Sequence, residues 1–456
     1  MLKNYSIKIF ICCVILFTSC KSDDDYTQLV IDAKPDSGEV FQNTFLEIDV
    51  LTNDLNIPES GILSVSSSEH AEIVVLDSNN TPGNPSDDSI LYTPDGVFSG
   101  TDTFQYTICS SDNNCDTAAV TINVLPVSPV NFDLDAFPYD TLSEYNFFEG
   151  NLKDLNPVYG VIPYDINSAL FTDYAHKKRF IWMPNGTKAV YEDDYSPLDF
   201  PEGTIIIKNF YYDNVLPDGN TKIIETRLLY RLEDRWEFAK YVWNDDLSEA
   251  FFTNEGSVVS FDWIDDNNVT KSVNYRVPSR QECFTCHNKF GEPIPIGPKP
   301  QNLNKNYSYT DGVKNQLTKW AEFGYLDVNY PDNIDTTVAW DDESQPLDLR
   351  VRSYIDINCA HCHAEQSYCE YRPMRFAFNT NDDLTNMGVC VEPDTNIGNE
   401  YPFIMNAGDA DASVVIFRIS STQEQFRMPL LGRTLQHTEG VELVREWMNS
   451  LTDRCQ

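Results

Sequence analysis

The segment VTINV, from Val120 to Val124, alternates apolar and polar residues without interruption. Alternation with a period of two is typical of a β-strand that has one buried and one exposed face. FLEIDV at Phe45–Val50 has the same pattern, IVVL at Ile73–Leu76 is a further strand-like run, and a cluster rich in Asn, Pro and Gly follows at 78–85. Short strands separated by turn signals predict an antiparallel β-sandwich over residues 29–126.

Three segments of this region resemble the bacterial Ig-like or cadherin-like surface module. They are VLTND at Val50–Asp54, YTP at Tyr92–Pro94 and FSGTDTFQY at Phe98–Tyr106. The resemblance implies an all-β spacer or adhesion domain. Its aspartates either hold calcium or lie in solvated loops.

The N-terminus reads as an export signal. Lys3 and Lys8 accompany an apolar run, Ile9–Phe17, that is too short to span a bilayer. The small residues before Cys20 resemble a bacterial lipoprotein signal, and the acidic residues after it resemble a tag for the cell surface. We expect a signal peptide at 1–19, a lipid on Cys20, an acidic linker at 20–28 and an outer-membrane lipoprotein that is surface-exposed or faces the periplasm. A plain secretory signal is the alternative.

Export gives meaning to the twelve cysteines. Outside the cytoplasm cysteines are oxidised, metallated or covalently occupied. Cys109 and Cys115 flank a short loop between two strand-like runs, so a disulfide between them is expected to close a hairpin. Cys369 and Cys390 are expected to form a second disulfide, and Cys455 has no assigned partner.

Two segments share the pattern Cys-x-x-Cys-His, namely CFTCH at Cys283–His287 and CAHCH at Cys359–His363. On one helical turn the sulfurs of Cys283 and Cys286, or of Cys359 and Cys362, can each form a thioether with a haem vinyl group. His287 and His363 then ligate iron from the proximal side. Zinc ribbons also use Cys-x-x-Cys pairs, but their two pairs usually lie much closer together in sequence.

The loop RMP at Arg427–Pro429 resembles the cytochrome c loop that supplies a methionine thioether to iron, so Met428 is the expected distal ligand of the second haem. The first haem has no such ligand nearby, because residues 288–358 contain neither methionine nor histidine. Three possibilities remain open. His176 or Met183 reaches over from the preceding domain, with His176 the tentative ligand; a residue of the second haem domain does so; or the sixth position is open.

Residues 130–456 resemble a family of poorly characterised diheme c-type cytochrome lipoproteins, often encoded beside a parallel β-helix protein. ALFTDYA at Ala169–Ala175, FPEGT at Phe200–Thr204, both haem motifs and the Arg427–Pro429 loop carry the resemblance. It implies two covalently bound c-type haems, electron transfer and a possible parallel β-helix partner. It supplies no known substrate.

Together these observations predict a multidomain protein. An N-terminal Ig-like sandwich (29–126) precedes a β-rich domain (130–275), and a capping box at Ser279 and Glu282 opens the first helix of a C-terminal, mainly α part. That part comprises a first haem region (276–345) and a second cytochrome c-like domain (346–456).

The expected function is electron transfer by a diheme cytochrome. The alternatives are a haem enzyme of peroxidase or oxidoreductase type that uses an open first haem, and a surface binding module stabilised by zinc. Lys and Arg number 32 against 71 Asp and Glu, which gives a net charge of −39. This charge disfavours nucleic acid and favours a redox partner with a basic docking face.

Overall fold

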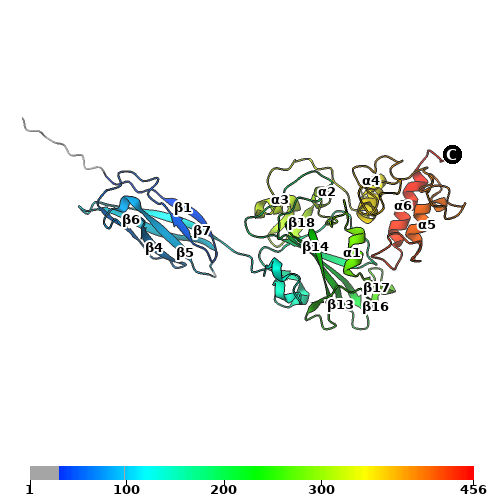
Figure 1. Cartoon of the computed structure of the whole chain (residues 1–456), viewed down its shortest axis with the longest axis horizontal. Coiled ribbons are helices and arrows are strands. Elements are labelled where there is room, and N and C mark those ends of the chain that lie inside the picture. Colours follow the sequence, from blue (N-terminus) through cyan, green and yellow to red (C-terminus); the bar gives the residue numbers. More distant parts are fainter. Residues whose placement is uncertain (1–29, 97) are drawn as a thin grey trace, which may run out of the picture. The chain divides into compact units, whose positions relative to one another are not determined.

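The computed structural model describes residues 30–96 and 98–456, and the chain forms two compact units, Met1–Pro126 and Val127–Gln456 (Figure 1). The expected signal peptide, the acidic linker and Cys20 lie outside the described residues. Within the described part of the chain, no helix is long and apolar enough to cross a membrane.

The first unit consists of two sheets around one core, in the strand orders β1-β7-β6-β3 and β2-β5-β4. The strands are β1 (Asp36–Phe41), β2 (Leu46–Ile48), β3 (Gly61–Val65), β4 (Ala71–Asp77), β5 (Asp88–Pro94), β6 (Gly100–Ser110) and β7 (Cys115–Leu125). In β7, Val120, Ile122 and Val124 point into the core and are at most 1% exposed, whereas Thr121 is exposed. The alternation in the sequence thus corresponds to the two faces of a sandwich strand. Cys109 and Cys115 face each other across the β6–β7 hairpin and form a disulfide.

Asp36, the first residue of β1, lies close to the carboxylates of Asp54 and Asp49. Its Oδ2 atom is buried and has no hydrogen-bond partner among the described residues. Burial first, and then the charge of Asp54, raise the pKa of Asp36 from 3.8 to about 6. The ionised form of Asp36 is therefore unfavourable in the folded state.

We expect the Ig-like unit to become less stable as pH rises. The folded state holds the Asp36 proton more tightly than the unfolded chain does, so the free energy of unfolding falls between the two pKa values of 3.8 and about 6. The loss is roughly 1 kcal/mol, because Asp36 is partly exposed and solvent screens its charge. Calorimetry of the full chain at pH 4 to 8 measures it. Asp36→Asn should raise the unfolding temperature of this unit at about pH 7, and an unchanged temperature contradicts the assignment.

The second unit is built on an eight-stranded sheet with the order β10-β11-β12-β13-β14-β15, extended by β16 and β17 beside β12. Its strands are β10 (Ile162–Tyr164), β11 (His176–Trp182), β12 (Ile205–Val215), β13 (Asn220–Arg231), β14 (Trp236–Trp243), β15 (Ala250–Phe252), β16 (Ser257–Ile264) and β17 (Thr270–Val277). Two short hairpins, β8–β9 (Phe148–Glu149 and Asn156–Pro157) and β18–β19 (Asn306–Tyr309 and Gly312–Asn315), lie outside this sheet.

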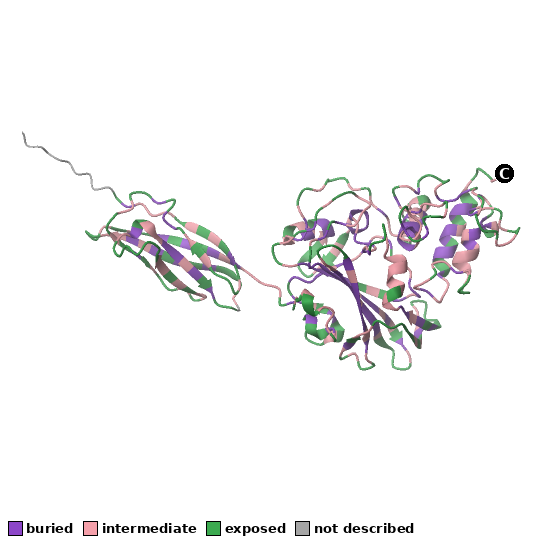
Figure 2. Cartoon of the chain, in the orientation of Figure 1, coloured by how far each residue is buried: buried purple, intermediate pink, exposed green. Residues whose placement is uncertain are grey.

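Both faces of the sheet are covered, and its central strands are buried along most of their length (Figure 2). On one face, Ile205 and Ile207 of β12 belong to a core with the segment that precedes the sheet. On the other face, Ile206 packs in a core with Leu303 and Trp320. Those two residues belong to the short helices α2 (Pro300–Leu303) and α3 (Gln316–Phe323). The segment after the first Cys-x-x-Cys-His motif therefore shares a core with the sheet.

The expectation of mainly α cytochrome domains at the C-terminus is wrong. Strands make up 32% and helices 16% of the structure. Beyond residue 345 the α-helices are α4 (Leu347–Ile355), α5 (Val414–Ser420) and α6 (Thr438–Ser450), of 9, 7 and 13 residues. Turns and loops form most of the rest of this segment. The amphipathic periods of α4 and α6 are real, but side-chain hydrogen bonds and turns, which leave no periodic pattern, hold the chain between them.

The expected Cys369–Cys390 disulfide is also wrong, because Cys390 is bonded to Cys455 and Cys369 is a buried free thiol. The Cys390 amide donates to the carbonyl of Met405 (2.9 Å). The amide of Ala407, two residues further on, donates to the sulfur of Cys455 (3.3 Å). The segment from Met405 to Ala407 thus brings together two cysteines that lie 65 residues apart.

Candidate metal centre

The second motif begins on a single π-helical turn, Asp356–Ala360, which continues α4. Such turns interrupt α-helices frequently at functional sites. The carboxylate of Asp356 accepts a hydrogen bond from the Phe378 amide (3.0 Å) and one from the Gln301 side chain (3.0 Å). The amides of Cys362 and His363 both donate to the carbonyl of Cys359 (3.1 and 3.0 Å). Because of this local turn, the two sulfurs and the imidazole of the motif line the same cavity.

That cavity has a volume of about 380 Å³, and Cys359, Cys362, His363 and Met428 all line it. Much of the remaining wall is apolar, including Ile355, Met374, Ile404, Met405, Ile419 and Val444. Two thiols, one imidazole and one thioether around an apolar cavity are the groups that a c-type haem requires. The residues at the second motif therefore fit a haem.

His363 is suited to ligation by its surroundings. Burial lowers its pKa to about 4, so the imidazole is neutral at physiological pH. Its Nδ1 atom is buried and has no hydrogen-bond partner among the described residues. The ring of Phe376 lies edge-on at 5.4 Å between centroids. A neutral imidazole is the form that binds a metal.

The loop that carries Met428 is held by its backbone. The Met428 amide donates to the carbonyl of Arg418 (3.0 Å), and the Met428 carbonyl accepts from Nε of the buried Arg433 (3.0 Å). Arg433 also donates to the carbonyl groups of Arg418, Ser421 and Leu435. The position of the loop therefore does not depend on the Met428 side chain itself.

The first motif lies on helix α1 (Arg280–Cys286) and ends at His287. Ser279 caps the helix, and Glu282 completes the capping box that the sequence predicts. His287 Nδ1 lies 2.8 Å from the carbonyl oxygen of Ile294, and burial lowers the pKa of His287 to about 3. A hydrogen bond from Nδ1–H to a carbonyl fixes the tautomer and leaves Nε2 available for a metal.

A second cavity, of about 120 Å³, lies between α1 and the strands β12–β14 and is lined by Cys283, Cys286 and His287. Four residues line both cavities, so the two candidate sites are neighbours: they are Cys286, His361, Pro429 and Leu431.

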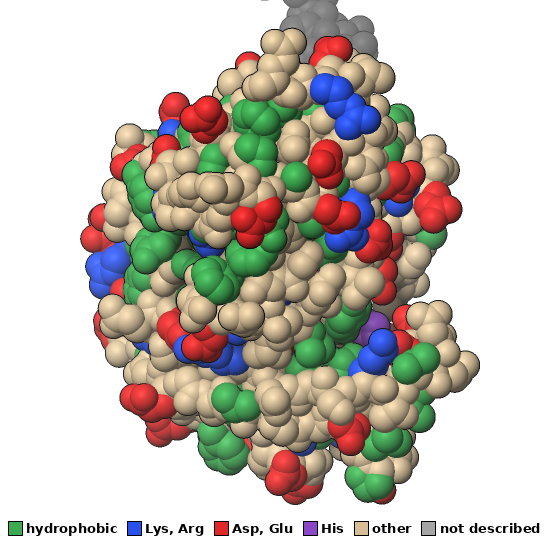
Figure 3. All heavy atoms as spheres, turned by 90° about the vertical axis from the view of Figure 1, so that its right-hand side faces the viewer, with side chains coloured by type: hydrophobic (Ala, Val, Ile, Leu, Met, Phe, Trp, Pro, Cys, Tyr) green, Lys and Arg blue, Asp and Glu red, His purple; other side chains and the backbone are tan. Residues whose placement is uncertain are grey.

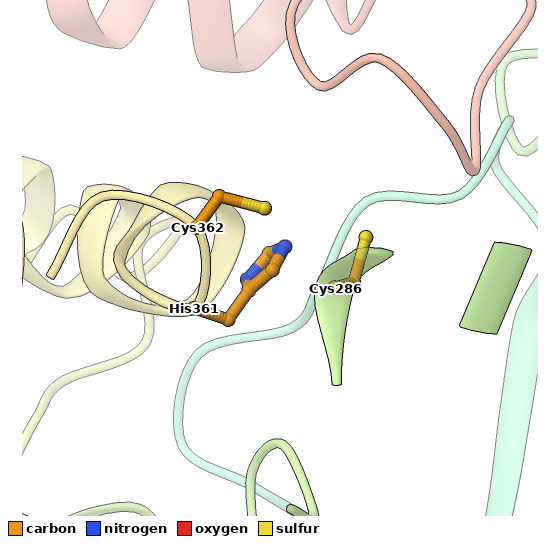
Figure 4. A group of neighbouring side chains, drawn as sticks. All are labelled: Cys286, His361 and Cys362. Carbon is orange, nitrogen blue, oxygen red and sulfur yellow. The ribbon is translucent and has the colours of Figure 1, made fainter. Parts of the chain in front are cut away.

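The two motifs also meet directly. A ligand atom of each of Cys286, His361 and Cys362 lies within 4.8 Å of the other two (Figure 4). Cys286 comes from the end of α1, and His361 and Cys362 come from the turn after α4. A hydrogen bond between the two thiols lowers the pKa of Cys286 and raises the pKa of Cys362. His361, which the sequence leaves unassigned, thus lies at the junction of the two sites.

The structure does not place the tentative ligand His176 at the first motif. His176 is exposed at the start of β11, 5.3 Å from the ring of Tyr211, and is not among the residues that line the His287 cavity. Met183 is fully buried in the core beside the sheet and does not line that cavity either. Neither residue of the β-rich domain considered from the sequence is in position to ligate a metal at His287.

Five basic residues line the His287 cavity: Arg280 of α1 and four residues of the sheet that the sequence did not single out, Arg179, Lys208, Arg227 and Lys240. Lys208 and Lys240 lie within apolar runs, such as IIIKNF at Ile205–Phe210, whereas Arg179 follows two lysines in β11. A charged residue in an apolar strand is a detectable signal, because an unpaired buried charge is costly.

Comparison with known proteins identifies the first unit. Residues 29–123 match the family model described as a bacterial Ig domain. This part of the chain is an Ig-like module. The Ig domain suggests an extracellular or surface protein. The aspartates of the described Ig domain form no group of three potential metal ligands.

No curated protein matches the chain. Among solved structures, a 2,6-sialyltransferase from Photobacterium sp. JT-ISH-224 is 14% identical, with 23% of this chain and 21% of that chain covered and a TM-score of 0.13. The match thus spans about a fifth of the sialyltransferase. The extracellular cadherin domains 1–4 of protocadherin gamma B7 are 9% identical, with 54% and 76% of the two chains covered and a TM-score of 0.17.

Proposed function

We propose that this protein is an exported diheme c-type cytochrome that transfers electrons through haems attached at Cys283/Cys286 and Cys359/Cys362. The observation that carries the proposal is the cavity at the second motif, where Cys359, Cys362, His363 and Met428 meet. A bound haem would supply one-electron redox chemistry. The chain would supply the two thioether sulfurs, the proximal His363, the distal Met428 and an apolar wall. His287 would be the proximal ligand at the first motif.

The proposed setting is the outer membrane. A lipid on Cys20 would anchor the chain, and the Ig domain would act as a spacer or adhesion module. The family resemblance adds a possible parallel β-helix protein as a neighbour. The Ig domain supports export, and the anchor itself is part of the proposal.

Two features favour electron relay over catalysis. The two candidate sites adjoin through four shared lining residues, which suits electron passage between them. At the second cavity, the lining residues Tyr371 and Tyr368 are 68% and 51% exposed, so two aromatic side chains reach the surface there. Figure 3 shows acidic side chains spread around hydrophobic ones at this end of the unit. With the net charge of −39, a redox partner with a basic docking face fits best.

A pyridine haemochrome assay tests the proposal on full-length protein produced with a haem-attachment system. We expect two covalent haems per chain, and one in the double variant Cys359→Ala/Cys362→Ala. The matched control Cys369→Ala removes a free thiol outside the motifs and should retain both haems. Absence of covalent haem from the unmodified chain would falsify the proposal.

A haem enzyme is the second candidate, because neither His176 nor Met183 lines the cavity at His287. An open sixth position at the first haem would allow peroxide or another small ligand to bind. A high-spin signal from one haem together with peroxide turnover supports this candidate. Two low-spin haems without turnover exclude it.

The cluster of Cys286, His361 and Cys362 favours a third candidate, a zinc site that stabilises a binding module. Structural zinc usually takes four ligands, and three lie together here. Metal analysis of protein purified without haem, with His361→Ala as the comparison, decides it. One equivalent of zinc that is lost in the variant supports a zinc site, whereas zinc-free protein opposes it.

A further inference from the structure

Four basic side chains form a row across the sheet below the first motif. Arg179 of β11 is the register partner of Lys208 on β12, Lys208 of Arg227 on β13, and Arg227 of Lys240 on β14. Residues directly opposite on antiparallel strands lie on the same face of the sheet. All four line the His287 cavity. We call these four residues the basic row.

Like charges that face each other across strands destabilise a sheet unless something compensates them. Two carboxylates do so in part: Asp165 pairs with Arg179 (2.5 Å), and the fully buried Glu225 pairs with Arg227 (2.5 Å). Asp165 also pairs with Lys305 (3.5 Å), and Lys208 and Lys240 have no ion pair with a described carboxylate. The basic row therefore has fewer carboxylate partners than basic side chains.

Donors without partners remain at Lys208 and Arg179. The side-chain amine of Lys208 has no hydrogen bond or ion pair among the described residues, and it lies 5.0 Å from the centre of the Phe210 ring. Burial and the neighbouring cations lower the pKa of Lys208 well below its usual value. Arg179 is 6% exposed, and its Nη2 atom is buried without a hydrogen-bond partner in the described chain. Lys240, in contrast, already donates to the carbonyl of Pro278 (2.7 Å). Two neighbouring cations thus retain unused donors.

An apolar row runs beside the basic row on the same face. Ile206, Leu229 and Phe238 are register partners, and each lies two residues along its strand from a member of the basic row. The Phe238 ring lies 5.1 Å from the His287 ring and 5.1 Å from Phe284. The cavity is therefore apolar beside the candidate iron ligand and basic further along the strands.

We infer that the basic row binds the two propionate carboxylates of the haem attached through Cys283 and Cys286. This inference rests on the proposed function. The apolar row would then pack against the porphyrin ring, and the two propionates would accept hydrogen bonds from the unpartnered donors of Lys208 and Arg179. Hydrogen bonds between ionised donors and carboxylates are the strongest in proteins. Carboxylates therefore suit the N–H donors of Arg179 and Lys208 that have no partner. The β-sheet thereby becomes part of the haem pocket.

The test compares Lys208→Met with Lys178→Met in the full-length haem protein. Both variants remove one positive charge, but Lys178 is exposed and pairs in register with Asn209, on the opposite face from the basic row. Spectroelectrochemical titration and resonance Raman spectra of the propionate bending modes are the readouts. We expect Lys208→Met to lower the reduction potential of one haem and to shift its propionate bands, because a nearby cation stabilises the reduced haem. Lys178→Met should leave both readouts unchanged.

The outcomes separate this inference from the proposed function. If two covalent haems are present and the two variants behave alike, the basic row does not bind propionates, and the cytochrome assignment stands. If Lys208→Met does not fold, Lys208→Gln replaces it, and Lys208→Arg should restore the original potential. If inorganic phosphate perturbs the spectrum of the original chain but not of Lys208→Gln, the row binds a diffusible anion and the inference is overturned.

Discussion

In the proposed diheme protein, replacing Met428 with alanine is expected to abolish the methionine-to-iron charge-transfer band of the second haem and to lower its reduction potential. A thioether ligand favours the ferrous state, so its loss lowers the potential. Axial ligands set haem potentials over a range of about 0.8 V, and a change on the order of 0.1 V is expected here. Because backbone bonds to Arg418 and Arg433 hold the loop, Met428→Ala should fold. Near-infrared absorption and redox titration measure the two effects.

Met374 provides the matched control, because it lines the same cavity at a different point of its wall. Met374→Ala makes the same side-chain truncation and should retain the charge-transfer band. If the band persists in Met428→Ala, or disappears in Met374→Ala, the distal ligand has been assigned to the wrong residue. Haem content should stay at two in both variants, since the thioethers are untouched.

Local patterns in the sequence predicted local structure well. The alternation at Val120–Val124 corresponds to strand β7, and the capping box at Ser279 opens α1. Both patterns act within a few residues, where strand pleat and helix capping are decided by the chain itself. The two Cys-x-x-Cys-His motifs are also local, since each places its sulfurs and imidazole on one turn.

The C-terminal segment shows where such reasoning fails. The loops between α4 and α5 are held by buried polar side chains, such as Asn381, which is 1% exposed and donates to the carbonyls of Arg352 and Phe376 (both 3.1 Å). Such hydrogen bonds leave no periodic pattern in the sequence. The amphipathic segments alone therefore led to an overestimate of the helix content. The Cys390–Cys455 pairing depends on the same long-range packing.

The basic row required the register of four strands. In sequence, Arg179, Lys208, Arg227 and Lys240 are charges in four separate strands, and Arg179 is the last of three consecutive basic residues that begin at Lys177. A shift of one residue in any strand would move its charge to the other face. Only the register of the four neighbouring strands β11, β12, β13 and β14 shows that these residues form one surface at the candidate haem site.

Asp173→Ala is the second variant with a large expected effect. Asp173 is 1% exposed, and its carboxylate accepts hydrogen bonds from the amides of Thr434 (2.7 Å) and Leu435 (2.8 Å) and from the Thr434 hydroxyl (2.9 Å). These bonds fasten the loop that carries Met428 to the β-rich part of the unit. Leaving three donors without an acceptor should cost about 3 kcal/mol of unfolding free energy. Chemical denaturation of the full chain measures this loss.

The loss of the Asp173 hydrogen bonds should weaken the Met428–iron bond of the candidate haem before the protein unfolds. With the loop released from Asp173, we expect Met428 to leave the iron in a fraction of molecules, so the charge-transfer band should weaken at temperatures well below the unfolding transition. Asp154→Ala, at an exposed carboxylate of the same unit, should change stability by less than about 0.5 kcal/mol and leave the band intact. If Asp173→Ala lowers stability but the band keeps its full strength up to the transition, Asp173 only stabilises the fold. A parallel loss of band and stability at the same temperature would likewise argue against a positioning role. Weakening of the band ahead of unfolding, seen only in Asp173→Ala, would instead link the Ala169–Ala175 segment to the distal side of the second haem.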